Sequence, residues 1–412
     1  MAKRFIAPAL ADLRQDIAGA IPLNLIQAWT ASPQDEGAER EILSAFRRVG
    51  TVVSTDSAGL SKLSQERPLL EVMKMVSEPK EIVHAYGTAI GGNAVGIWTA
   101  DNMEMFYPGE IHPREILDHM IAAQREIAPL AVHIGMGVHA GEFLEIGGGV
   151  FGPEADVVEA LAEEFTEGGE IAVTPQVREK VQAFFPSGTF SSKGVAHMEA
   201  YRCDYRGVAP RALKGSNHKY PFPFNEEFFN FLRRYEGPDT AETQRILSSY
   251  GQEAVVILVR VRHPAAMLLR QLTQWVIANG LIQEVARGDQ VTIIKSNGSL
   301  GIFLASRPLH ALEFAEDMAV SLEANGFDYN IGIAGGEVLV FPMGNSEREI
   351  AGEPVNIASK ISEDVEDRGT IYIEDGVAKT IQLLERVAGA ERFRLAISHM
   401  ELEGVKVKGT RF

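Results

Sequence analysis

Cysteine is almost absent from this sequence, because Cys203 is the single one among 412 residues. A disulfide within the chain is therefore excluded, and the composition fits a reducing compartment. We interpret Cys203 as a strand residue without a catalytic role. The length suffices for two or three domains that each bury a core of apolar side chains.

Long apolar stretches are absent as well. The longest aliphatic run covers residues 254–261, interrupted only by Arg260, and is far short of the roughly 20 residues that a membrane-spanning helix needs. The first residues, Met-Ala-Lys-Arg-Phe, lack the apolar segment of a secretory signal. We therefore expect a soluble cytoplasmic protein without a membrane span.

Positive charge is scarce. Lysine and arginine number 39 against 56 aspartate and glutamate residues, which gives a formal net charge of −17. A broad surface for nucleic acid or for anionic lipid is therefore excluded, since such surfaces depend on clustered cations. Basic side chains that contact phosphate must act locally.

The sequence does contain an internal repeat. The segment Gly137-Val-His-Ala-Gly-Glu142 recurs as Gly332-Ile-Ala-Gly-Gly-Glu337, and Gly152-Pro-Glu-Ala-Asp156 recurs as Gly352-Glu-Pro-Val-Asn356. The offsets are 195 (332 − 137) and 200 (352 − 152), so order and spacing hold over long distances. Two copies of one domain are the simplest explanation.

The repeat and the positions of proline and glycine divide the chain into four parts. We expect a helical lead-in at 1–46, a first copy at 47–203, a connector at 204–250 and a second copy at 251–412. Apolar strands and amphipathic helices alternate in both copies, which predicts an α+β fold in duplicate.

Four short motifs follow one another in the same order in one copy or the other. They are Asp56-Ser-Ala-Gly-Leu-Ser61, Ile97-Trp-Thr-Ala-Asp101, the Gly-x-His-x-Gly-Glu strand at 137–142 and the Gly-x-x-Val-Asn-x-Ala-x-Lys helix at 352–360. Together they resemble the D-[IV]-x-G-[FL]-[ST] segment, the K-x-x-G-D hairpin and the two later motifs of the class III nucleotidyl cyclases. The resemblance covers the chain apart from the lead-in and the connector.

This resemblance implies two ferredoxin-like domains that form an intramolecular pseudo-dimer with a site at their interface; a domain-swapped dimer is the alternative. In the family, one domain binds two divalent cations and the other recognises the base and stabilises the transition state. The implied metal ligands are Asp56 and Asp101. Their carboxylate oxygens would hold two Mg²⁺ or Mn²⁺ ions.

The second copy lacks these ligands. Residues 254–283 contain no acidic side chain, Arg260 or Arg262 lies near the first metal position, and Ser299 occupies the second. The resemblance instead assigns other roles to this copy. Lys295 and Glu349 would bind adenine, Asn356 would orient the ribose, and Lys360 stands where the family has an arginine on the phosphate.

The first copy has lost these residues in turn. At the corresponding positions it has Ile97, Gly149, Asp156 and Ala160. Because the losses fall on opposite sides in the two copies, one composite site is expected to survive and its mirror image to be inactive.

A late lysine, Lys408, resembles the family's lysine on the triphosphate. The first copy has Lys193-Gly194 in a similar context, whereas the His-Met-Glu triplets at His197 and His399 suggest a different alignment. Both alignments stay open from the sequence.

Each candidate residue also has a purely structural interpretation. Asp56 could cap a helix, Lys295 could be a solvated strand lysine, Glu349 a loop carboxylate and Asn356 a polar residue on a helix surface. The register of the repeat favours the functional interpretation.

The sequence therefore predicts an adenylate cyclase that converts ATP to 3′,5′-cyclic AMP and pyrophosphate. Two alternatives are kept. One is a catalytically silent pseudo-cyclase that binds nucleotide or a partner as a sensor, which the lysine at position 360 favours. The other is a pyrimidine nucleotide cyclase.

Overall fold

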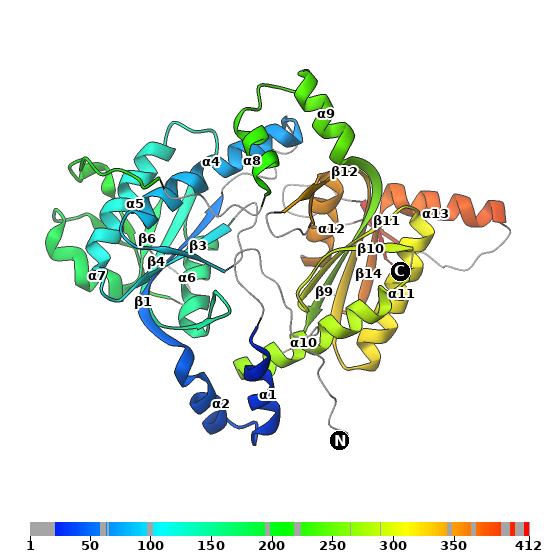
Figure 1. Ribbon diagram of the computed structural model, residues 1–412, viewed down its shortest axis with the longest axis horizontal. Helices are drawn as coiled ribbons and strands as arrows, with labels where there is room; N and C mark the ends of the chain where they lie inside the picture. The colour runs from blue at the N-terminus through cyan, green and yellow to red at the C-terminus, as the bar shows by residue number, and fades with distance from the viewer. Residues whose placement is uncertain are drawn as a thin grey trace. The chain divides into compact units, whose positions relative to one another are not determined.

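The computed structural model describes residues 21–57, 63, 66–96, 102–193, 198–217, 224–263, 265–288, 290–343, 348–363, 368–388, 396–399 and 408–411. These residues form two compact units (Figure 1). The described parts of Arg40–Pro223 make up the first unit, and those of Ala20–Glu39 and Phe224–Phe412 make up the second. No described helix has the length and apolar character needed to cross a membrane.

The first unit contains a mixed sheet with the strand order β2-β3-β1-β4-β6-β8-β7, and β5 pairs with β4. Its strands are β1 (Arg47–Ser57), β2 (Asn93–Val95), β3 (Asn102–Pro108), β4 (Ile134–Ile146), β5 (Gly149–Phe151), β6 (Ile171–Val173), β7 (Phe190–Lys193) and β8 (Ala200–Cys203). Its main helices are α4 (Leu69–Thr88), α5 (Pro113–Ile127), α6 (Pro153–Glu163) and α7 (Pro175–Val181), with a 3₁₀ turn at Gln182–Phe184.

The second unit contains a sheet with the order β10-β11-β9-β12-β14-β16-β15, and β13 pairs with β12. Its strands are β9 (Gly251–Arg262), β10 (Val291–Ser296), β11 (Leu300–Ala305), β12 (Asp328–Pro342), β13 (Arg348–Ala351), β14 (Thr370–Glu374), β15 (Ala396–His399) and β16 (Lys408–Arg411). The matching helices are α10 (Leu268–Val285), α11 (Pro308–Ala324), α12 (Glu353–Glu363) and α13 (Asp375–Ala388).

The two sheets have the same strand order and the same register, which confirms the predicted duplication of an α+β fold. Gly137 on β4 pairs with Ser54 on β1, and the repeated Gly332 on β12 pairs with Leu258 on β9. The strand pairing therefore gives a residue correspondence between β1 to β8, the first copy, and β9 to β16, the second copy, apart from a register shift between Ile293 and Lys295 on β10.

The repeated glycine lets a helix approach the central strand closely. A Cβ on Gly332 would lie 2.2 Å from the carbonyl oxygen of Ala358 on α12, and a Cβ on Gly137 would lie 2.9 Å from the backbone of α6. Any larger residue would push the helix away. The glycines of the sequence motif therefore fix the position of α6 and α12, and α12 carries Asn356 and Lys360.

Apolar side chains cover both faces of the second sheet. On one face Ile257, Phe303 and Ile331 pack against α10 and α11, and on the other Val256 and Val338 pack against α12. Figure 1 labels these helices beside the strands of this sheet. Successive side chains of β9 and β12 point alternately to the two faces of the sheet, as strands require, and both faces are covered.

The lead-in helix α1 (Leu23–Ala31) belongs to the second unit, and the connector is divided between the two units. Helix α1 packs on α10, and Glu39 of α2 (Glu36–Leu43) accepts a hydrogen bond of 2.8 Å from the backbone N–H of Leu269. In the connector, α8 (Glu226–Arg233) and α9 (Ala241–Tyr250) belong to the second unit, where Phe228 stacks on Phe341. Residues 205–217 pack on the first unit. The predicted domain boundaries stay predictions.

Candidate functional site

Asp56 lies near the end of β1, where it is partly buried. It pairs with Asn102 on β3 and with Gly135 on β4. Its predicted partner Asp101 lies outside the described residues, but Asn102, the next residue, stands directly opposite Asp56. Within the described ranges, no group of three or more His, Cys, Asp or Glu side chains is arranged to hold a metal ion.

The same position in the second copy carries the opposite charge. Arg260 pairs with Leu300 and Asn330, as Asp56 pairs with Asn102 and Gly135. Two arginines, Arg260 and Arg262, were predicted near this position, and the strand pairing shows that Arg260 is the counterpart of Asp56. In the same alignment Ser299 matches Asp101. Arg260 forms an ion pair with Glu363 on α12.

Lys295 and Glu349 come together in the second copy although they are 54 residues apart. Nζ of Lys295 on β10 lies 3.1 Å from Oε2 of Glu349 on β13, and the two side chains are 17% and 19% exposed. Oε1 of Glu349 also accepts a hydrogen bond of 3.1 Å from the N–H of Ile350. Glu349 is thus a strand residue held from two sides rather than a loop carboxylate.

The first copy has no charge at these two positions. Gly149 pairs with Ile146 as Glu349 pairs with Phe341, so the predicted replacement by glycine agrees with the register. The replacement of the lysine needs a correction. Val95 rather than Ile97 occupies the place of Lys295, as the two hairpins show.

The β2–β3 hairpin is two residues longer than its counterpart. Val95 pairs with Glu104, nine residues later (104 − 95), whereas Lys295 pairs with Ile302, seven residues later (302 − 295). Glu104 and Ile302 correspond, since they pair with Ser54 and Leu258. A count back from Asp101 therefore gives a counterpart of Lys295 that is two positions too late in the sequence. Ile97 itself lies outside the described residues.

An open pocket of about 770 Å³ lies at this place in the first copy. Val95 and Gly148 line it together with Phe106, and Arg48 and Glu145 supply charge of both signs. Nε of Arg48 lies 3.5 Å from Oε2 of Glu145. At the position that matches Val95, the second copy has Lys295 in its ion pair with Glu349.

Asn356 and Lys360 lie four residues apart on α12, so their side chains share one face of the helix. Asn356 is exposed and Lys360 is partly buried. In the first copy, α6 carries Asp156 and Ala160 at these positions. The structure thus brings the two predicted residues to one helix face, and their roles stay predictions.

Lys408 is the first residue of β16, and its side chain lies outside the described residues. Thr410 pairs with Ile373 as Tyr201 pairs with Val173, so Lys408 corresponds to Glu199. By the pairing of β15 and β7, Lys193 corresponds to Ser398. Neither alignment considered from the sequence agrees with this register.

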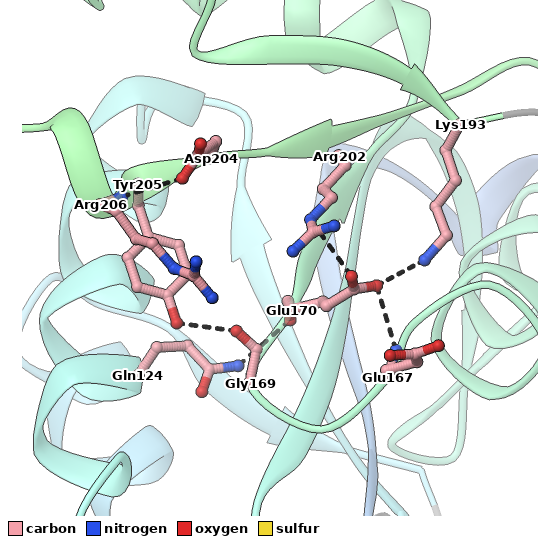
Figure 2. Close-up of polar contacts among 9 residues, drawn as sticks. All are labelled: Gln124, Glu167, Gly169, Glu170, Lys193, Arg202, Asp204, Tyr205 and Arg206. Atoms are coloured by element: carbon pink, nitrogen blue, oxygen red, sulfur yellow. Dashed lines mark hydrogen bonds and ion pairs between the residues drawn. The ribbon is translucent and has the colours of Figure 1, made fainter.

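Lys193 has a structural partner instead. Its Nζ lies 2.5 Å from a carboxylate oxygen of Glu170, whose other oxygen lies 3.1 Å from Arg202, as Figure 2 shows. Burial raises the pKa of Glu170, but hydrogen bonds from Lys193 and from the backbone of Glu167 outweigh it, so the pKa lies below its ordinary value. This network ties β7 and β8 to the start of β6.

One carboxyl group near the site was missed by the sequence analysis. Glu104 faces α6 from β3, and burial raises its pKa to about 8, with further contributions from the charges of Glu159 and Glu163. Successive residues of a strand point to opposite faces, so an acid between the buried Met103 and Met105 would be expected to face away from their core. The sequence therefore carries no local signal for the burial of Glu104.

Comparison with known proteins gives the fold. No family model and no curated protein matches the sequence. A solved class III adenylyl cyclase-like ATP-binding protein from Pseudomonas aeruginosa matches 81% of this chain and 85% of its own, with 12% identity and a TM-score of 0.50. The adenylyl cyclase CyaB from P. aeruginosa matches 40% of this chain and 96% of its own, with 16% identity and a TM-score of 0.34. A bacterial light-regulated adenylyl cyclase matches 38% and 91%, with 19% identity and a TM-score of 0.33.

Proposed function

The chain has the class III adenylyl cyclase-like fold in two tandem copies, and on this premise we propose that it is an adenylate cyclase. The 3′-hydroxyl of ATP would lose its proton to solvent and its oxygen would attack the α-phosphorus; the bond from this phosphorus to the oxygen that bridges to the β-phosphorus would break, and pyrophosphate would leave. The proposed site is composite, with one half on each copy.

The observation that carries this proposal is the complementary distribution of charged residues at matching positions. The first copy has Asp56 where the second has Arg260, and the second has Lys295 and Glu349 where the first has Val95 and Gly149. Random loss would be expected to remove residues from both halves of the same site. Here each copy keeps a different half.

The Lys295–Glu349 pair supports recognition of adenine. The base presents an acceptor ring nitrogen beside a donor amino group, and the pair presents an ammonium donor 3.1 Å from a carboxylate acceptor. Because the two groups are mostly buried and already paired, they would be oriented before the nucleotide arrives.

On α12, Asn356 would hydrogen-bond the ribose and Lys360 would place a positive charge near the α-phosphate. The two residues are one helical turn apart, which suits neighbouring groups of one nucleotide. Lys408 would contact the terminal phosphates. A lysine supplies charge without the bidentate fork of arginine, so a slow turnover is expected.

The donor chemistry of Asp56 fits a hard divalent cation, since it offers carboxylate oxygens at the end of a strand. Together with Asp101 it would hold two Mg²⁺ or Mn²⁺ ions, which when bound would favour ionisation of the 3′-hydroxyl and offset charge on pyrophosphate. The protein's own contribution is to place both carboxylates beside the phosphate chain.

A turnover assay of the full chain with ATP, GTP, CTP and UTP in the presence of Mn²⁺ tests the proposal. We expect cyclic AMP as the main product and its loss in Asp101→Asn. If no nucleoside triphosphate is cyclised, the chain is not a cyclase. If CTP is cyclised in preference to ATP, the pyrimidine alternative is correct, because cytosine offers the same acceptor and donor edge.

A second candidate is nucleotide binding without turnover. Lys360 in place of an arginine favours it, and the similar P. aeruginosa protein is described as cyclase-like and ATP-binding. Thermal unfolding with ATP separates the two. A rise in the midpoint without cyclic product would select the silent binder, since a ligand that binds only the folded state stabilises it.

A further inference from the structure

The hairpin formed by β12 and β13 carries Glu349 and is longer than its counterpart in the first copy. Glu349 comes eight positions after its strand partner Phe341 (349 − 341). Gly149, at the matching place, comes only three positions after its partner Ile146 (149 − 146). The two glycines between them have φ angles of 61° and 87°, as a tight two-residue turn requires. The first hairpin is therefore closed by its own turn, whereas the longer second hairpin keeps more freedom unless other contacts hold it.

The connector meets the second hairpin at its outer end. Phe224 forms an antiparallel bridge with Met343, and the N–H of Asn225 donates a hydrogen bond of 3.1 Å to the carbonyl oxygen of Pro342. Asn225 also caps α8, because its Oδ1 accepts a hydrogen bond of 2.8 Å from the N–H of Phe228. The connector therefore extends the hydrogen bonding of the hairpin and begins a helix at the same point.

Aromatic rings then join α8 to the hairpin. The rings of Phe228 and Phe341 are stacked, with centroids 5.0 Å apart and an interplanar angle of 0°. Phe224 meets Phe341 edge-on at 4.9 Å. Phe228 is fully buried and Phe341 is 2% exposed. Because buried aromatic pairs combine a large apolar area with a preferred geometry, Phe341 is held firmly by these two rings of the connector.

Phe228 has a second anchor in the same unit. Its ring meets that of Tyr250, the last residue of α9, edge-on at 5.7 Å. The ion pair of Arg245 with Glu227 also joins α9 to α8, but both side chains are exposed, so its contribution is small. Since β9 begins at Gly251, directly after Tyr250, Phe228 connects the hairpin to the start of a central strand.

The position of Phe341 determines that of Glu349. The two residues stand directly opposite each other, so their side chains lie on one face of the hairpin with Cβ atoms about 5 Å apart. Oε2 of Glu349 meets Nζ of Lys295 on β10 at 3.1 Å. A group that recognises a ligand must be held to within about 0.5 Å of its productive place. A hairpin that moves away from α8 would carry the carboxylate with it.

We propose that Phe228 is a positioning residue for adenine recognition, because it fixes Phe341 and, through Phe341, the carboxylate of Glu349. This role rests on the function proposed above, in which Glu349 accepts a hydrogen bond from the amino group of adenine. Phe228 acts without contact to the nucleotide. The connector helix thereby completes the base-binding half of the second copy. The first copy has Gly149 at that place, with no side chain to position.

Two nucleotides, with and without the amino group, test this role in the full chain. Purine riboside triphosphate lacks the 6-amino group, so it offers Glu349 no donor. Phe228→Leu should lower kcat/KM for ATP about 10-fold and leave kcat/KM for purine riboside triphosphate within about two-fold. The control Phe314→Leu removes another buried ring of the same unit, which packs on Phe303 at 4.8 Å, and should leave the ratio of the two values unchanged.

A double-mutant cycle completes this comparison. In a Glu349→Ala chain, Phe228→Leu should cause no further loss of kcat/KM for ATP, because the group that it positions is gone. If the chain binds nucleotides without turnover, dissociation constants take the place of kcat/KM. Equal losses for the two nucleotides, or the same loss in the Glu349→Ala chain, overturn the proposal.

Amide hydrogen exchange without nucleotide separates this inference from the proposed function. The N–H of Ile350 donates to Oε1 of Glu349, and it should exchange at least about 10-fold faster in Phe228→Leu than in the unchanged chain or in Phe314→Leu. Unchanged exchange overturns the positioning role even if the chain cyclises ATP. Faster exchange in a chain that neither binds nor cyclises ATP refutes the adenine role together with the proposed function.

Discussion

The two copies differ most in charge at the end of the sheet, where β1 faces α6 and β9 faces α12. In the second copy Arg260 neutralises Glu363 within the fold. The first copy keeps an acid at the matching helix position, Glu163, but has Asp56 in place of the arginine. One backbone register thus supports two opposite charge distributions.

The first copy carries a further acid at this end. Glu104 replaces Ile302, and burial raises its pKa to about 8, with further contributions from the charges of Glu159 and Glu163. Carboxylates that lie close together oppose one another's ionisation, and a bound cation would offset this repulsion. The comparison therefore teaches that one fold carries opposite charge at matching positions, which is the basis of the division of roles proposed above.

Replacing the carboxylate by an amide at the first position should have the largest effect. We expect Asp56→Asn to lower cyclic AMP formation by about 10³-fold or more, because the carboxylate oxygens proposed to hold the cations lose their charge. The matched variant Arg260→Gln changes the same position of the second copy and should stay within a few-fold of the unchanged protein. Initial rates with Mn²⁺ measure both. Equal losses in the two variants would contradict the division of roles.

Exchange of the two base-binding charges should have the next largest effect. The double variant Lys295→Glu, Glu349→Lys keeps an ion pair but loses the acceptor for the N–H of Ile350, so the unfolding free energy should fall by about 1 to 3 kcal/mol. The donor and the acceptor are reversed, and kcat/KM for ATP should fall about 100-fold. Val95→Ala, at the matching position of the first copy, is the control. Unchanged use of ATP by the double variant would remove the base-binding role.

The pH dependence of the unfolding free energy should differ between the two copies by about 2 kcal/mol. The pKa of Glu104 is raised from 4.5 to about 8 in the folded protein, so the folded state holds this proton more tightly than the unfolded chain. Stability should therefore fall as the pH rises from about 4.5 to about 8, by about 2 kcal/mol after allowing for partial exposure to water.

Glu104→Gln should remove this slope, and the exposed acid variant Glu179→Gln should keep it. Urea unfolding of the first unit between pH 5 and pH 9 measures the difference. The second copy has Ile302 at this position and should show no matching slope. A slope that survives Glu104→Gln would assign the effect to other groups.

The duplicated fold could be predicted because its signals are local. The repeated glycines mark close contacts between a helix and a strand, and α5 begins with Pro113 directly after His112, whose side chain caps it. The apolar run at 254–261 lies within β9. Such patterns depend on periodicity and sterics, which the sequence carries directly.

Register could not be predicted where loops change length or strands are short. Two extra residues in the β2–β3 hairpin moved the counterpart of Lys295 from Ile97 to Val95. The Lys-Gly pair at 193–194 looked like a match for Lys408, but only the strand pairing distinguishes them. The contact of Lys295 with Glu349 also depends on tertiary pairing of distant strands, which no local pattern contains.

The smallest predicted effect concerns Lys360, which is proposed to lie near the α-phosphate of ATP. Lys360 is partly buried on α12, and its counterpart on α6 is Ala160. Lys360→Arg should raise kcat by about 10-fold without changing KM, because a guanidinium can donate two hydrogen bonds to one phosphoryl group in the transition state. Ala160→Arg places the same group in the inactive mirror position and should leave kcat unchanged. A rise in kcat for Ala160→Arg would mean that the mirror position retains a role in turnover. A fall in KM alone for Lys360→Arg would mean that the side chain contacts the triphosphate in the ground state.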